Sequence, residues 1–234
     1  PPPERMCLSL PELLSPLSFP FCLFASRPRG VVAGRVGFCA GFVKPAKNRI
    51  IYNNGMKPAL FLDRDGVIIE NRAAYVRSWE DVEFLPGALD ALAAMRTSPY
   101  AIVIVTNQSA VGRGIITLAQ AEAINRGVLD VIEKNGGRVD GVFICPHAPG
   151  DNCQCRKPKP GLLLQAAEAL DLDLSQSVMV GDAVSDLLAG QSAGIRRTFL
   201  VKTGRGAAQA KLPEAARLRP FQICDSLSDV VACV

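Results

Sequence analysis

Two carboxylates separated by one residue follow an apolar run, a pattern typical of ligand-binding and catalytic sites. Asp63 ends an apolar run that begins at Ala59, and Asp65 and Gly66 follow directly. Such a run is typical of a buried strand, and ligands of open α/β sheets bind where strands end. Because alternate residues of a strand share a side, the two carboxylates are expected to face the same way. Two such groups repel each other unless a cation or a shared proton lies between them. The alternative is a strand end with ordinary turn-forming residues.

Polar side chains also follow two other predicted strands. They are Thr106 and Asn107 after the strand predicted for 101–105, and Asp182 and Asp186 after the strand predicted for 177–180. The carboxyl ends of parallel strands meet at one edge of a sheet, so we expect these groups to gather there. A set of this kind is poorly explained by turn residues alone.

These residue types suit phosphoryl transfer. Asp63, Asp182 and a backbone carbonyl are hard oxygen ligands that fit Mg²⁺. Asp63 is the candidate nucleophile, because a carboxylate can attack phosphorus and form an aspartyl-phosphate. Asp65 is placed to protonate the leaving alcohol and then to activate water. Thr106 and Asn107 can donate hydrogen bonds to phosphoryl oxygens.

Strand and helix patterns alternate along the chain from Lys57 onward. Strands are predicted for 59–63, 101–105, 141–145, 177–180, 198–201 and 221–224, and helices for 86–96, 117–134, 162–170 and 186–192. Thr117 and Gln120 have the spacing of a capping box. This alternation predicts an α/β fold with a doubly wound parallel sheet. The connections leave no room for a large cap domain, so we expect an open site rimmed by residues 67–80 and by the loop after 145.

That loop carries three cysteines and the single histidine of the chain, namely Cys145, His147, Cys153 and Cys155. Four such ligands at short spacing predict tetrahedral zinc, and four protein ligands make the site structural rather than catalytic. A redox pair at Cys153 and Cys155 is the alternative. The loop runs directly into Arg156 and Lys157, so the metal is expected to position both.

These motifs, in this order, resemble those of the haloacid dehalogenase superfamily of phosphohydrolases. The matching segments are Asp63-Arg64-Asp65-Gly66-Val67, Thr106-Asn107, Lys157 and Gly181-Asp182-x-x-x-Asp186. The resemblance implies a Rossmann-like sheet, Asp63 as nucleophile and Asp65 as general acid/base. It implies Thr106 and Lys157 as groups that stabilise the phosphoryl group. It also implies Mg²⁺ held by Asp63, the backbone carbonyl of Asp65 and Asp182.

The residues around these motifs are similar to one branch of the superfamily. Thr106-Asn107-Gln108-Ser109, Gly112-Arg113-Gly114 and the cysteine loop resemble the D-glycero-D-manno-heptose 1,7-bisphosphate 7-phosphatase and histidinol-phosphatase branch. The resemblance implies that Arg156 helps to recognise substrate, together with Asn107, Asn71, Arg72 and Tyr75. Arg113 would either contact a phosphate or cap a loop, and both interpretations stay open.

The resemblance implies removal of the 7-phosphate of the heptose bisphosphate, with histidinol phosphate as the alternative substrate. A protein of another class, a catalytically silent sugar-phosphate sensor stabilised by zinc, is the second hypothesis. It is disfavoured because a silent binder has no need for both Asp63 and Asp65.

Composition bounds the partners and the compartment. The net charge of +4 is uneven, because residues 1–55 hold seven of the 26 basic residues but only two of the 22 acidic ones. The rest is near neutral, which argues against nucleic acid as a partner. No stretch predicts a membrane span or a secretory signal. Cysteines clustered for metal binding suit a reducing cytoplasm. We expect a monomer that acts on a small metabolite, a single phosphatase domain over 56–234, and a disordered or non-native extension over 1–55 with Met56 as natural start.

Overall fold

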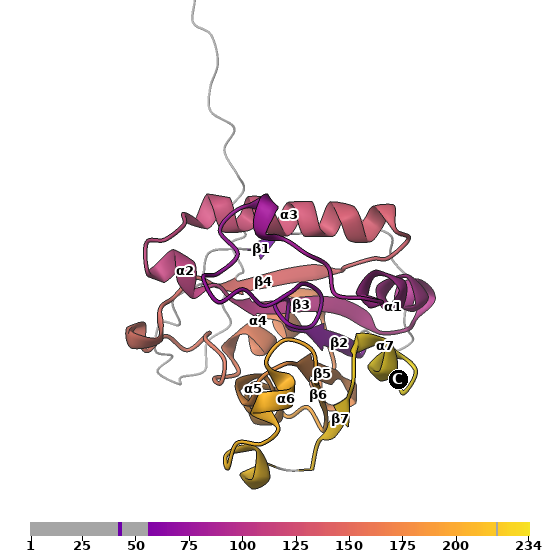
Figure 1. The fold of residues 1–234 in the computed structure, drawn as a ribbon. Coiled ribbons are helices and arrows are strands. Elements are labelled where there is room, and N and C mark those ends of the chain that lie inside the picture. The colour runs from indigo at the N-terminus through magenta and orange to yellow at the C-terminus, as the bar shows by residue number, and fades with distance from the viewer. Residues whose placement is uncertain (1–41, 44–55, 219) are drawn as a thin grey trace, which may run out of the picture. The chain divides into compact units, whose positions relative to one another are not determined.

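Short aliphatic runs form a seven-stranded sheet in the described part of the computed structural model, which covers residues 42–43, 56–218 and 220–234 (Figure 1). The strands are β1 (Phe42–Val43), β2 (Ala59–Leu62), β3 (Ala101–Asn107), β4 (Gly141–Cys145), β5 (Val178–Gly181), β6 (Arg197–Val201) and β7 (Gln222–Cys224). Apart from β1, the predicted extension over 1–55 lies outside the described residues.

The strand order places the carboxyl ends of β2 and β5, which carry Asp63 and Asp182, side by side. The sheet runs β1-β4-β3-β2-β5-β6-β7, and β2 to β7 are mutually parallel, while β1 pairs antiparallel with β4. The chain builds outward from β2 to β4 and then crosses to β5 on the other side of β2. The predicted doubly wound α/β fold is therefore confirmed. The point between β2 and β5, where the direction of winding reverses, is where such sheets bind ligands.

Helices cover both faces of this sheet. They are α1 (Ala88–Ala94), α2 (Ser109–Gly112), α3 (Leu118–Lys134), α4 (Gly161–Leu170), α5 (Val184–Ser192), α6 (Gly206–Gln209) and α7 (Leu227–Val231). Buried residues of α1, α3 and α7 pack on one face, and those of α4 and α5 pack on the other. None of the helices in the described ranges has the length and apolar character needed to cross a bilayer.

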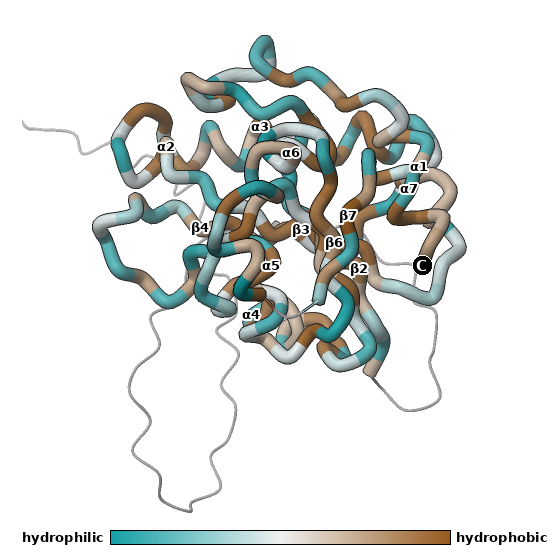
Figure 2. Tube along the Cα trace, turned by 60° about the horizontal axis from the view of Figure 1, so that its bottom comes forward, coloured by the Kyte–Doolittle hydropathy of each residue, from teal (hydrophilic) through white to brown (hydrophobic). Residues whose placement is uncertain are grey.

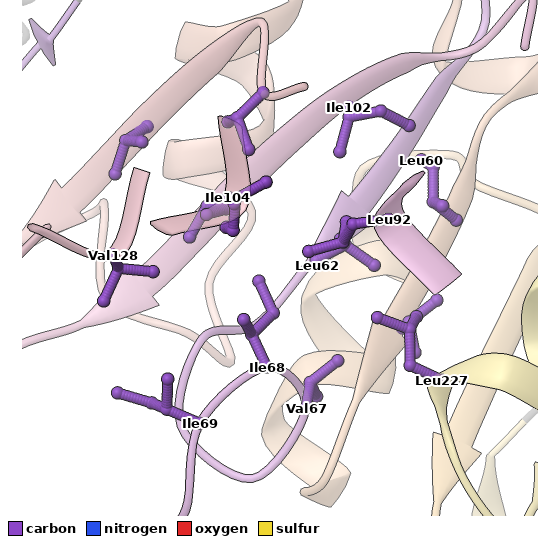
Figure 3. Close-up of a cluster of buried hydrophobic side chains, with 14 of the residues drawn as sticks. Leu60, Leu62, Val67, Ile68, Ile69, Leu92, Ile102, Ile104, Val128 and Leu227 are labelled. Atoms are coloured by element: carbon purple, nitrogen blue, oxygen red, sulfur yellow. The ribbon is translucent and has the colours of Figure 1, made fainter. Parts of the chain in front are cut away.

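The alternation of side chains along β2 and β3 fixes which residues form each half of the core. Leu60 and Leu62 point with Ile102 toward α1 and α3 (Figure 3), whereas Phe61 points to the opposite face, against α4. Both faces are buried, so the strands are hydrophobic throughout, as parallel strands usually are. Figure 2 shows this concentration of hydrophobic residues along β3 and β6.

Most predicted boundaries agree with the structure to within two residues. The capping box at the start of α3 is present: the Thr117 hydroxyl accepts a hydrogen bond from the Gln120 backbone N–H at 3.2 Å, and the Gln120 side chain accepts one from the Thr117 N–H at 2.8 Å. Strand β3 extends to Asn107, two residues past its predicted end.

The loop after β2 differs from its prediction. Residues 67–80 were expected to rim an open site, but Val67, Ile68 and Ile69 are at most 1% exposed and pack into the core beside Leu62 (Figure 3). Three consecutive aliphatic side chains gain more from burial than from lining a polar site. The exposed part of this loop begins only after Glu70.

Candidate active site

Three side chains from three parts of the chain form a buried ionic cluster at the switch point. The Lys157 Nζ lies 2.9 Å from an oxygen of Asp63 and 2.7 Å from an oxygen of Asp186. It also donates a hydrogen bond to the Val105 carbonyl at 2.8 Å. The Lys157 and Asp186 side chains are each 1% exposed and that of Asp63 is 8% exposed. Lys157 is thus the internal counter-ion of two carboxylates, one of which is the predicted nucleophile.

Burial and charge act in opposite directions on this cluster. Burial is the main cause that raises the pKa of Asp63 to about 7; Lys157 opposes this shift, and the nearby carboxylates Asp186 and Asp182 contribute to it. Burial alone would lower the pKa of Lys157, but Asp186 and Asp63 outweigh it and raise the pKa. Lys157 therefore stays charged. Because burial disfavours the ionised form of Asp63 even with Lys157 beside it, a second cation nearby would stabilise that form.

This shift predicts how stability depends on pH in Mg²⁺-free buffer. A carboxyl group whose pKa is raised in the folded state binds more protons there than in the unfolded chain, so its stabilising contribution is lost as pH rises from about 4 to about 7. We expect the melting temperature to fall across this window, and the fall to be reduced in Asp63→Asn, which cannot titrate. Thermal unfolding between pH 4.5 and pH 8 checks this. Equal slopes for both proteins would contradict it.

Asp182 extends the cluster from the end of β5 and is fully buried. Its carboxylate accepts a hydrogen bond from Asn71 at 3.1 Å, and from the Arg205 backbone N–H at 2.9 Å. The Arg205 guanidinium adds two more, at 3.2 Å from Nε and 2.9 Å from a terminal nitrogen. The backbones of Gly66 and Gly204 pass so close that a Cβ at either would lie within 2.5 Å of an Asp182 oxygen.

The carboxylates together fit a hard cation. One oxygen each from Asp63, Asp182 and Asp186 lie within 4.8 Å of one another, and all three residues are buried. Ionised carboxylates buried this close repel one another unless a cation or a shared proton lies between them. The donor set is all oxygen, which suits Mg²⁺ rather than a softer metal. The predicted pair Asp63 and Asp182 is thus brought together, whereas the Asp65 carboxylate is not part of this group.

The Asp65 carboxylate instead belongs to a second polar group beside the cluster. Arg64 donates to both of its oxygens, at 3.1 Å from Nε and 3.0 Å from a terminal nitrogen. Gln108 donates to the same carboxylate at 3.1 Å and to the Thr106 hydroxyl at 2.8 Å. The Thr106 hydroxyl lies 3.5 Å from Asp65. The two predicted catalytic residues Asp65 and Thr106 therefore share one hydrogen-bonded network.

Asn107 holds the lysine loop in place. Its side-chain amide donates to the Lys157 carbonyl at 3.0 Å and accepts from the Lys157 backbone N–H at 3.1 Å. This reciprocal pair fixes the backbone of a residue fifty positions away in the sequence. Asn107 was predicted to bind substrate, and in the structure its side chain positions Lys157.

The predicted zinc ligands converge on one point. The Cys155 thiol lies 3.3 Å from that of Cys145, 3.4 Å from that of Cys153 and 3.3 Å from Nδ1 of His147. All four ligand atoms lie within 4.8 Å of one another. A hydrogen bond from Cys155 lowers the pKa of the Cys145 thiol to about 5. Three thiols and an imidazole at these separations fit a tetrahedral metal, and the thiolate is the form that binds it.

The remaining predicted substrate contacts are only partly buried or exposed. Arg156 donates to the His147 carbonyl at 3.2 Å and so stays attached to the metal loop. Arg72 is exposed and pairs with Glu83 at 2.9 Å. Tyr75 is half-buried with a positive φ of 65°, and Arg113 is exposed just after α2.

Sequence reasoning missed three residues. Arg64 and Gln108 lay within the quoted motifs, but only the side chains flanking them were given roles. Arg205 follows β6, whose carboxyl end meets the same edge of the sheet as that of β5. Applying the strand-end argument to every strand would have found Arg205.

Comparison with known proteins defines the class to which this fold and site belong. A family model described as HAD-hydrolase-like matches residues 154–230. The D-glycero-β-D-manno-heptose-1,7-bisphosphate 7-phosphatase of Bordetella bronchiseptica is 39% identical over 174 residues, which cover 73% of this chain and 94% of the relative. The enzyme of the same name from Escherichia coli is 36% identical over 180 residues, 74% of this chain and 91% of the relative.

A solved structure agrees with these relatives. The crystal structure of the D,D-heptose 1,7-bisphosphate phosphatase from B. bronchiseptica, complexed with magnesium and phosphate, superposes with a TM-score of 0.69 at 36% identity. The match covers 75% of this chain and 97% of that one. The chain belongs to the haloacid dehalogenase-like hydrolases and, within them, to the phosphatases.

Proposed function

We propose that this protein is a Mg²⁺-dependent phosphatase that removes the 7-phosphate of D-glycero-D-manno-heptose 1,7-bisphosphate through an aspartyl-phosphate on Asp63. The observation that carries the proposal is the buried cluster of Asp63, Lys157 and Asp186 beside Asp182 at the switch point. The names of the relatives supply the substrate. These relatives are named for the β anomer, which we therefore expect to be preferred.

The first step transfers the phosphoryl group to the protein. An oxygen of Asp63 attacks phosphorus, the bond from phosphorus to the sugar oxygen breaks, and Asp65 gives its proton to the leaving oxygen. Lys157, 2.9 Å from the nucleophile, would stabilise negative charge on the phosphoryl oxygens, together with the Thr106 hydroxyl, which lies 3.5 Å from Asp65. In the second step, Asp65 takes a proton from water, which attacks phosphorus and releases phosphate and free Asp63.

Asp63, Asp182 and the backbone carbonyl of Asp65 would hold the magnesium ion. When bound, Mg²⁺ would neutralise the carboxylates and polarise the phosphoryl group. Asn71 and Arg205 donate to the Asp182 carboxylate. These bonds would either orient this carboxylate toward the metal or break when the metal binds. Arg156, Arg72, Tyr75 and Arg113 are proposed to contact the substrate from the rim, together with Asn107 through its backbone.

Phosphate release from both anomers of the heptose bisphosphate and from histidinol phosphate, measured side by side, tests the substrate. A preference for heptose bisphosphate of tenfold or more in kcat/KM, about 1.4 kcal/mol of transition-state binding, is expected. Asp63→Asn should abolish turnover while the melting curve stays cooperative. A preference for histidinol phosphate would reassign the substrate, and turnover by Asp63→Asn would rule out the nucleophile.

Arg205 is expected to compete with Mg²⁺ for Asp182. Its guanidinium occupies both oxygens of that carboxylate, so a metal must displace it. Because the Arg205 side chain is 55% exposed, solvent screening reduces its effect, and we expect Arg205→Ala to tighten Mg²⁺ binding by roughly threefold to tenfold. Calorimetric titration of Mg²⁺ measures this. Lys211→Ala removes an exposed charge nearby in sequence and is the control; equal affinities for both variants would contradict the competition.

We further propose that the cluster of Cys145, His147, Cys153 and Cys155 holds structural zinc. Close approach of the four ligand atoms supports zinc over a redox pair at Cys153 and Cys155. A thiolate cluster of this kind supports a cytoplasmic location, where thiols stay reduced. We also propose a monomer whose single phosphatase domain spans 56–234. Six of the seven strands of the sheet lie in that range, and β1 pairs with β4 from outside it.

A further inference from the structure

Arg64 is the largest side chain that is fully buried in the described part of the protein, and the proposed mechanism gives it no role. Its side chain is 1% exposed, although arginine is rarely buried unless every donor group is paired. The burial of a guanidinium next to the proposed general acid/base Asp65 therefore suggests that Arg64 acts on Asp65.

All three nitrogen atoms of the Arg64 guanidinium have a partner. Nε and one terminal nitrogen bind the two oxygens of Asp65, at 3.1 and 3.0 Å, in the two-point geometry that fixes the plane of a carboxylate. The other terminal nitrogen donates to the side-chain oxygen of Asn125 at 2.8 Å. Arg64 thus links the Asp65 carboxylate, whose side chain is 21% exposed, to helix α3.

Asn125 is itself unusual. It is 2% exposed in the buried face of α3, among residues such as Ile124 and Val128, and its amide nitrogen has no hydrogen-bond partner. An unsatisfied buried polar group costs about 1–3 kcal/mol. A hydrophobic residue would suit this face better, so the hydrogen bond that the Asn125 side-chain oxygen accepts from Arg64 explains its presence.

We propose that Arg64, anchored by Asn125, is a positioning residue that holds the Asp65 carboxylate in the orientation needed for proton transfer to the leaving group. This inference rests on the proposed role of Asp65 as general acid. A carboxylate held at both oxygens by a guanidinium that is itself bonded to a rigid helix cannot rotate freely. Gln108, which donates to Asp65 from the end of β3, completes the restraint.

The leaving group distinguishes positioning from general destabilisation. A poor leaving group needs a proton from the general acid, whereas a good one departs without it. We would measure kcat/KM for a series of aryl phosphates of graded leaving-group acidity, together with one alkyl phosphate. Loss of positioning makes the dependence of rate on leaving-group acidity steeper. A structural defect lowers all rates by the same factor and leaves the slope unchanged.

Four variants complete the experiment. Asp65→Asn provides the slope without a general acid, and Arg64→Lys keeps the charge but loses the two-point geometry. Asn125→Ala removes only the anchor, and Val128→Ala is its matched control, a buried truncation one turn further along α3. We expect Arg64→Lys and Asn125→Ala to steepen the slope, with a loss of about tenfold or more on the alkyl phosphate and little loss on the best leaving group. Val128→Ala should leave the slope unchanged.

The slopes of these variants distinguish a wrong role for Arg64 from a wrong role for Asp65. A steeper slope in Asp65→Asn, with wild-type slopes in both Arg64→Lys and Asn125→Ala, would overturn the positioning role alone. An unchanged slope in Asp65→Asn would remove Asp65 as the acid, and the positioning role with it. If Arg64→Lys does not fold, Asn125→Ala decides, because it leaves Arg64 and Asp65 chemically intact.

Discussion

Lys157→Met is expected to destabilise the protein by about 3–5 kcal/mol in Mg²⁺-free buffer, because it leaves Asp63 and Asp186 buried without their shared cation. Methionine fills a similar volume, so packing is nearly conserved. The same change should lower kcat by about 10²–10³-fold, the usual cost of one lost donor to a developing charge. Urea unfolding and steady-state kinetics measure the two effects separately.

An exposed ion pair elsewhere in the protein provides the control for this buried one. Lys202 pairs with Asp225, and their side chains are 53% and 77% exposed. Lys202→Met should leave both the unfolding free energy and kcat nearly unchanged, because exposed pairs contribute little. A comparable loss of stability in both variants would show that burial of the Lys157 cluster is not the cause. Restoration of stability by Mg²⁺ in Lys157→Met would show that a second cation can replace the ammonium.

Removal of zinc is expected to have the other large effect. In the proposed site the four ligands would hold the loop 145–155, and structural zinc contributes on the order of 10 kcal/mol to local folding. Cys155→Ser should therefore lose the metal, lower the melting temperature and reduce activity, although Cys155 is not in the active site. Activity falls because Lys157 is two residues further along the chain and loses its position beside Asp63.

Metal analysis and a matched cysteine variant test this prediction. Protein purified under reducing conditions should contain one zinc per chain, and Cys155→Ser should contain none. Cys233→Ser, which changes an exposed cysteine outside the cluster, should keep both zinc and activity. Activity that depends on reductant rather than on zinc content would favour the redox pair at Cys153 and Cys155.

The sequence predicted the parts of the site that follow from strand ends. Asp63, Thr106 and Asp182 each end a hydrophobic run, and the doubly wound order of the sheet brings two of those ends side by side at β2 and β5. The convergence of the four cysteine-loop ligands was equally predictable, since ligand types and short spacing indicate it without any knowledge of the fold. Residues 101–107 show the limit of this approach, because β3 runs two residues further than its hydrophobic pattern.

Contacts between side chains distant in sequence could not be predicted in this way. The bond from Arg64 to Asn125 joins the end of β2 to the middle of α3, and nothing in the local pattern at either residue indicates it. The same holds for Asn107, whose amide spans fifty positions to reach Lys157. Val67, Ile68 and Ile69 were assigned to a rim by their position in the chain, but their hydrophobicity decided their place.

The solvent exposure of each side chain indicates which positions of this enzyme can be substituted without loss of stability and which cannot. Asp63, Lys157 and Asp182 are buried, so a substitution there changes folding as well as chemistry. Arg72 and Arg113 are exposed on loops, where substitutions usually change stability by less than about 0.5 kcal/mol. If Arg72 and Arg113 contact the substrate as proposed, a library restricted to these positions would redirect the phosphatase toward other phosphate esters at little cost in stability.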